Sequence, residues 1–352
     1  MTRPVAATTP AAAAVAASVA AVIGIFTLRV ADSDPDFALS RPGPFGAAVL
    51  LLPAWSLIAV GLTGWWRQQE ARPTAWLAAA GVGWLVAEWD NPGVGHSPAF
   101  TAGLVLAAVV PPLVLHGAVS YPAGRPDRLE RAALAVGYLV TVVVLGLLPA
   151  LAEDPGEIGC LDCPRDLLAV ADRSGLASVL ARVGLGLTAA WALLAAGVLL
   201  RRVAVGSPAR RRARAGMALS AAAYLVLVGA SALHVVLDDS QYVDEATRAL
   251  RAGEAAALLA VASAAAWGWA RRGRTRGRVA RLVLDLAATP APGGLGDALA
   301  SGLGDHTVRL GYWLTDGRLV DVNGAPVAVT DAATPLLRGG RPVALLTHRP
   351  SR

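Results

Sequence analysis

The chain has 352 residues, of which 55% are hydrophobic and only 16% are charged. In soluble domains about a quarter of the residues are charged. The mean hydropathy of this chain is +0.53. The chain has too few polar residues to cover the surface of a water-soluble protein of this size. The same composition excludes intrinsic disorder, because disordered chains are poor in apolar residues and rich in charge. The composition therefore predicts a mainly α, polytopic helical membrane protein.

Eight apolar segments approach the length of a membrane span, which is about 20 residues for about 30 Å of hydrocarbon. The first of them could be a signal peptide because Arg3 precedes it, but its apolar run is long and seven more follow, so we count it as a helix. The sequence thus predicts about eight transmembrane helices. They cover residues 10–29, 45–65, 74–89, 99–121, 132–151, 177–200, 216–237 and 254–270.

The arginines predict the side of the membrane on which each loop lies. Every basic residue is an arginine, and eighteen of them fall in alternate segments beginning with the N-terminus. Those segments hold three acidic residues, whereas the loops on the other side hold six arginines and most of the acids. We therefore expect a plasma-membrane protein with both termini cytoplasmic and arginine clusters that contact membrane lipid. Topology explains the net charge of +6 without nucleic-acid binding.

The composition changes after the last apolar segment. We divide the chain into an eight-helix transmembrane sensor region at 1–275, an exit helix and linker at 276–292, and a cytoplasmic segment at 293–352. The sequence predicts that the exit helix continues the eighth span.

The cytoplasmic segment has the pattern of a small α+β fold. Residues 295–303 have the spacing of a short amphipathic helix, and Asp316-Gly317 and Asn323-Gly324 are hairpin turn signals. Alternating apolar residues then predict about four strands. We expect them at 306–314, 318–322, 326–329 and 342–347.

Two cysteines, Cys160 and Cys163, lie in the outer loop between the fifth and sixth predicted spans. In an oxidising compartment such a pair closes a structural disulfide or acts as a thiol–disulfide switch, and both readings stay open. A metal site would need two further ligands, for which His96 and His234 are the imidazoles on the outer side.

Three ionisable residues fall within or at the ends of predicted spans. Glu88 and His234 lie near outer ends, and His116 lies toward an inner end. Such residues are candidates for intramembrane sensing because their burial is costly, although Glu88 and His234 also fit polar residues at the interface. Pro111 and Pro112 predict a kink in the fourth span, with a signalling hinge as its functional reading.

Motifs of catalysis are missing from the sequence. It contains no phosphate-binding loop, no zinc-protease helix motif and no nucleophile elbow. We assign no catalytic residue, no cofactor and no metal ligand from the sequence alone.

Several short motifs occur together and in order, and through them the chain resembles the N-terminal membrane half of actinobacterial two-component sensor histidine kinases. They are Trp84–Gly95 (WLVAEWDNPGVG), Pro111–Leu113 with His116, Ser120–Gly124 (SYPAG), Gly159–Pro164 (GCLDCP), Ala266–Leu286 and Pro290–Leu299 (PAPGGLGDAL).

The resemblance implies a membrane input region followed by a GAF-like segment, a phosphoacceptor helix and an ATP-binding domain. It also implies a homodimer that acts with a histidine-kinase core and a response regulator. This chain ends within the GAF-like part, and neither His306 nor His348 lies in a helical phosphoacceptor pattern. The expected function is therefore a sensor module without kinase activity of its own, whose kinase core is separate or missing.

Two other functions remain alternatives. A small-solute transporter or channel would show internal repeats, broken helices and polar sites at mid-membrane, and the sequence has no clear repeat. A membrane thiol-redox protein would use Cys160 and Cys163, but it would need a quinone site or a second cysteine pair to pass electrons on.

Overall fold

The computed structural model divides the chain into two compact units, Met1–Ala266 and Trp267–Arg352, and each is described by itself. The residues described are 10–35, 37–40, 43–66, 71–121, 125–152, 164–170, 174–205, 208–238, 244–288, 296, 309–314, 317–327, 333–338 and 341–347.

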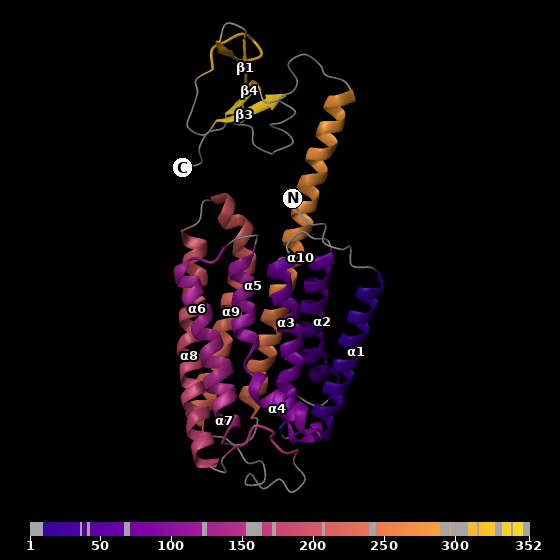
Figure 1. Cartoon of the computed structure of the whole chain (residues 1–352), viewed down its shortest axis with the longest axis vertical. Helices are drawn as coiled ribbons and strands as arrows, with labels where there is room; N and C mark the ends of the chain where they lie inside the picture. Colours follow the sequence, from indigo (N-terminus) through magenta and orange to yellow (C-terminus); the bar gives the residue numbers. More distant parts are fainter. Residues whose placement is uncertain are drawn as a thin grey trace. The chain divides into compact units, whose positions relative to one another are not determined.

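The first unit is a helical bundle (Figure 1). Its last helix, α10, continues without a break into the second unit. The helical elements are α1 (Pro10–Ser33), α2 (Pro44–Trp66), α3 (Ala71–Val86), η1 (Ala87–Asp90), η2 (Pro92–Val94), α4 (Ser97–Leu106), α5 (Val110–Ser120), α6 (Arg128–Tyr138), η3 (Leu139–Leu147), α7 (Leu148–Ala150), α8 (Ser174–Ala204), α9 (Pro208–Asp238) and α10 (Glu245–Ala288).

Six of the described helices are long and apolar enough to cross a membrane, or seven if α4 and α5 count as one broken span. The chain is a multi-pass membrane protein, as its composition predicts. The predicted span at 74–89 corresponds to α3, which has only 16 residues before the backbone tightens into the 3-10 helix η1. That tightening leaves α3 below the length of a full span.

The helices of the bundle pack around one continuous apolar core. In Figure 1, α1, α2 and α3 lie on one side, α6, α8 and α9 lie on the other, and α5 and α10 pass between them. Residues from both sides are fully buried in the same cluster, including Trp84 of α3, Leu115 of α5, Tyr224 of α9 and Leu258 of α10. One face of α10 is therefore part of the core that joins the two sides.

The predicted kink in the fourth span lies just before the two prolines. α4 and α5 are bent by 55° at a break over Ala107–Val109, and Pro111 and Pro112 occupy the first turn of α5. Proline is tolerated in a first turn, but it has no N–H to bond the carbonyl four residues earlier. Those carbonyls belong to Ala107 and Ala108, so the helix opens there.

A π-helical stretch, η3, faces this break. A Cβ on Gly146 would lie 2.2 Å from the carbonyl oxygen of Val105 in α4, and one on Gly184 of α8 would lie 2.8 Å from Cα of Leu145. The two glycines let η3 approach α4 on one side and α8 on the other. This close packing holds one wall of the space that the helix break opens.

The last turn of α8, which contains Arg201 and Arg202, is tied to the start of α6. Asp127 and Glu130 form a reciprocal capping box, and the Glu130 carboxylate also forms a buried ion pair with Arg202. The exposed Asp127 carboxylate lies 3.5 Å from Arg201. The hydrogen bond from the Glu130 backbone N–H lowers the pKa of Asp127. Two acid–arginine pairs thus fasten α6 to α8.

The second unit contains a four-stranded antiparallel sheet in the order β2-β1-β4-β3. Positive φ angles of 82° at Gly317 and Gly324 match the predicted turns. The strand predicted at 326–329 reduces to a single bridge between Val320 and Pro326 in the described part of the chain. Most of the helix predicted at 295–303 lies outside the described residues. The strands are β1 (Arg309–Trp313), β2 (Leu319–Val320), β3 (Thr334–Arg338) and β4 (Arg341–Thr347).

Candidate functional site

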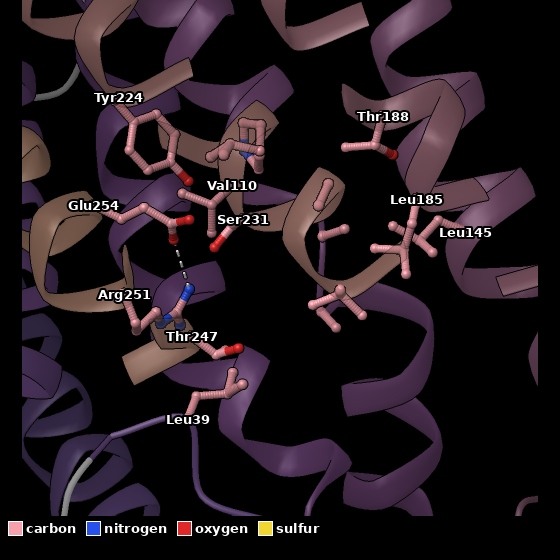
Figure 2. A pocket seen from close by; sticks show the side chains of 16 residues that line it. Leu39, Val110, Leu145, Leu185, Thr188, Tyr224, Ser231, Thr247, Arg251 and Glu254 are labelled. Carbon is pink, nitrogen blue, oxygen red and sulfur yellow. Dashed lines mark hydrogen bonds and ion pairs between the residues drawn. The ribbon is translucent and has the colours of Figure 1, made fainter. Parts of the chain in front are cut away.

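A cavity of about 200 Å³ lies beside the break between α4 and α5, inside the first unit (Figure 2). Liquid water takes about 30 Å³ per molecule, so the space holds about six waters or one small organic molecule. The wall is mostly aliphatic and comes from four helices, η3 and the α1–α2 connection. It is lined by Leu39, Ala107, Ala108, Val110, Pro111, Leu145, Leu185, Thr188, Tyr224, Val228, Ser231, Ala232, Val235, Thr247, Arg251 and Glu254.

Two charged side chains of α10 border the cavity. Nη1 of Arg251 lies 3.4 Å from Oε2 of Glu254, and only 13% and 6% of the two side chains are exposed. The hydroxyl of Ser231 on α9 also hydrogen-bonds to Glu254. Burial of a charge is costly unless it is paired, so the two side chains compensate each other within α10, and the Ser231 contact joins the pair to α9.

Arg251 also faces α3 and η1. Its Cζ atom lies 3.3 Å from the ring centroid of the fully buried Trp84, a cation–π contact. Glu88 and Asp90 lie within electrostatic reach of the same guanidinium. One guanidinium therefore interacts electrostatically with three carboxylates, two from η1 and one from its own helix.

Glu88 is buried within the protein. Only 1% of the residue is exposed, and Oε2 accepts a hydrogen bond from the backbone N–H of Leu39 at 3.2 Å. Asn91 Nδ2 and Arg248 Nη2 donate to the carbonyls of Asp34 and Pro35, at 2.9 and 3.1 Å. These three bonds hold the α1–α2 connection over Glu88 and exclude solvent from it. The Glu88 side chain therefore lies inside the protein, and its depth in the membrane stays a prediction.

Two polar atoms of the cavity lining have no hydrogen-bond partner within the described part of the chain. They are Nη2 of Arg251 and Oγ1 of Thr188, which lie well apart in Figure 2. Buried polar groups are nearly always bonded to protein or to water. An aliphatic cavity with two such atoms fits a small apolar molecule that carries a hydrogen-bond acceptor, or ordered water in its place.

His116 lies apart from the cavity. Its ring stacks on Trp76 of α3 with centroids 4.0 Å apart, and Nδ1 lies 3.3 Å from the hydroxyl of Tyr138 on α6. These contacts join α5 to α3 and α6 through a ring that is only partly buried. His116 thus packs between α3 and α6, and its role in intramembrane sensing stays a prediction.

His234 lies near the end of α9 and contacts the start of α10. Its Nε2 atom is 3.0 Å from Oδ2 of Asp244, whose Oδ1 accepts the backbone N–H of Thr247 at 2.8 Å. Asp244 thus caps α10 while it faces His234. Hydrogen bonds from Thr247 lower the pKa of Asp244 to about 2, and His234 adds to the effect.

Cys160 and Cys163 lie outside the described residues, whereas residues 164–170 immediately after them are described. The Thr101 hydroxyl donates to Oδ1 of Asp166 and accepts the backbone N–H of Leu167, both at 2.9 Å. The segment that follows the cysteines is therefore bonded to α4, one of the two helices that flank the break.

No known family model, curated protein or solved structure matches this chain. Of the residues named from the sequence, Pro111 lines the cavity and Glu88 lies within electrostatic reach of Arg251, but Arg251, Glu254 and Thr188 were not singled out. Arg251 was assigned to an outer loop because the last apolar run begins at residue 254. The spacing of Arg251 and Glu254, three residues apart on one helix face, is the signal that could have found them.

Proposed function

We propose that the chain is a membrane-embedded input module of two-component signalling, which passes a signal to a histidine-kinase core carried elsewhere. The observation that supports this is the continuity of α10. Arg251 and Glu254 border the cavity in its first turns, and the same helix runs on to Ala288. A helix is stiff over such a length, so a change in its packing at the cavity alters the helix beyond the bundle.

The charges around Arg251 suggest how occupancy of the cavity would act. The guanidinium binds Glu254 on one side and the face of Trp84 on the other. A molecule that offers an acceptor to Nη2 of Arg251 would draw the side chain toward the cavity and weaken its hold on α3. The balance between these contacts would then set the rotation or tilt of α10.

The topology proposed for this function has eight spans with both termini cytoplasmic. α3 and η1 together would form the third span, and α4 with α5 the fourth. A membrane-impermeant maleimide should then label Cys160 and Cys163 in intact, reduced cells. A cysteine placed at Ser207 in a Cys160→Ser/Cys163→Ser background should react only after the membrane is permeabilised. Labelling of the Ser207 position in intact cells would contradict this topology.

Recovery of the kinase partner tests the function itself. The tagged chain is cross-linked in its native membranes, purified and incubated with labelled ATP. We expect a copurified protein that carries acid-labile phosphate, as phosphohistidine does, and no label on the chain. Thr188→Val keeps the volume of a cavity side chain but removes its unpartnered hydroxyl, and it should change the labelling several-fold. Gly197→Ala, on an open face of the same helix α8, is the matched control.

The cavity at a helix break also supports a second function, transport of a small solute. Broken helices that flank a polar site are typical of secondary transporters, and here the 55° break of α4 and α5 lies beside Arg251 and Glu254. Purified chain in liposomes would then carry solute flux that Glu254→Gln abolishes. Flux without a phosphorylated partner would favour transport over signalling.

The C-terminal sheet fits the proposal as part of a GAF-like output segment, and the input module is proposed to work as a homodimer. The same cross-linking experiment tests the dimer, because copies of the chain that carry two different tags should copurify.

A further inference from the structure

Three potential metal ligands meet where α9 passes to α10. His234 and Asp238 are four residues apart and therefore share one face of the last turns of α9. Asp244 is the residue before α10. One donor atom from each lies within 4.8 Å of the other two. The sequence suggests His234 as a metal ligand only together with Cys160 and Cys163, and it places Asp238 and Asp244 in the loop that follows the seventh predicted span.

We propose that His234, Asp238 and Asp244 bind a divalent transition-metal ion of the zinc class, which clips the end of α9 to the start of α10. One imidazole and two carboxylates carry two negative charges when the imidazole is neutral, so the ligand set balances a dication. Imidazole favours zinc and its neighbours over magnesium and calcium, which prefer oxygen ligands alone.

The spacing of the donor atoms fits this ion class. Two ligands at about 2.1 Å from a tetrahedral zinc ion are about 3.4 Å apart. Nε2 of His234 and Oδ2 of Asp244 are already 3.0 Å apart. Asp238 is exposed at the end of α9, so its carboxylate can close the remaining distance by rotation of the side chain. The fourth position would be left to water.

The carboxylate of Asp244 is oriented for this role. Its Oδ1 atom is occupied by the backbone N–H of Thr247, at 2.8 Å, so Oδ2 faces His234. Ligands that a further hydrogen bond holds in place are a regular feature of metal sites. In the metal-free chain, Nε2 of His234 and Oδ2 of Asp244 face each other across the position that the ion would take.

The metal would act on the helix that borders the cavity. Thr247, which bonds to Asp244, lines the cavity, and Arg251 follows one turn later. A clip at Asp244 would fix the first turn of α10 against α9. Metal binding stands independently of the proposed function, whereas its use as a signal rests on that function.

The test is a titration of the full-length chain in detergent with Zn²⁺, followed by calorimetry, and with Co²⁺, followed by its absorption bands. A Cys160→Ser/Cys163→Ser background removes thiols as competing ligands. We expect one ion per chain and an absorption spectrum typical of nitrogen and oxygen ligands. His234→Gln and, separately, Asp238→Asn should each weaken binding at least about tenfold.

His96→Gln is the matched control, because His96 is an exposed histidine that lies outside the trio. It should leave the affinity unchanged. Asp238→Asn keeps the test valid if His234→Gln fails to fold, since Asp238 is exposed. Absence of binding, or binding that survives both variants, would overturn the metal site. If the ion binds but no kinase partner is recovered, the site stands and the signalling function fails.

Discussion

Replacing Arg251 with methionine should destabilise the bundle more than any other single change at the cavity. The guanidinium forms an ion pair with Glu254 and attracts the carboxylates of Glu88 and Asp90 at longer range. Removing one partner of a buried ion pair costs about 3–5 kcal/mol, because the other charge is left unpaired. We expect a loss of this size in the free energy of unfolding, measured by denaturant titration in detergent.

Two further variants make this prediction specific. Arg248→Met removes an arginine one turn earlier on α10, whose Nη2 donates to the carbonyl of Pro35 at 3.1 Å. It should cost less, about 1.5–3 kcal/mol, as for one hydrogen bond to a charged group. Arg251→Met combined with Glu254→Gln should be more stable than Arg251→Met alone, because fewer charges are left unpaired. Equal losses for Arg248→Met and Arg251→Met would contradict the central role of Arg251.

The membrane-spanning character could be predicted from the sequence because it depends on local composition. The apolar runs predict helices at the positions of α1, α2, α8 and α9 to within a few residues at most ends. They do not reveal that α3 tightens into η1 at Ala87 or that α4 ends at Leu106. Both features depend on contacts between elements, such as the approach of Gly103 in α4 to the backbone of Trp89 and Asp90.

The candidate site could be predicted only in part, because its burial is produced by distant segments. Glu88 lies near the end of an apolar run, where hydropathy indicates an interface. The α1–α2 connection covers it, through a bond to the backbone of Leu39, and local sequence gives no sign of that. Arg251 was misplaced for a similar reason. An arginine at the edge of an apolar run is expected to be exposed, and the sequence does not reveal that the ring of Trp84 lies against it.

The C-terminal sheet shows the same limit on a smaller scale. Turn residues and alternation locate β1, β2 and β4. β3 was missed because Thr334–Arg338 is short and contains Pro335. Proline is compatible with a strand at the edge of a sheet, and β3 occupies the edge in the order β2-β1-β4-β3. Whether a short segment becomes an edge strand depends on the neighbouring β4, with which it pairs.

Gly146→Ala should destabilise the chain and alter the cavity, although it adds one methyl group. The new Cβ would lie 2.2 Å from the carbonyl oxygen of Val105, so η3 and α4 would have to move apart. Overpacking of this kind costs about 1–3 kcal/mol. Because Leu145 beside it lines the cavity, the movement would also disturb the wall that faces Arg251 and Thr188. The free energy of unfolding in detergent measures the first effect.

The matched control is Gly197→Ala on α8, where an added Cβ meets no atom within 4 Å. Alanine is better than glycine in a helix by about 1 kcal/mol, so this variant should gain stability or leave it unchanged. The same chemical change is thus expected to act with opposite signs at the two positions, since helix propensity favours alanine at both and only Gly146 faces another backbone. If Gly146→Ala were also neutral or stabilising, η3 and α4 would not be in close contact. The break between α4 and α5 would then lack the wall that encloses the cavity.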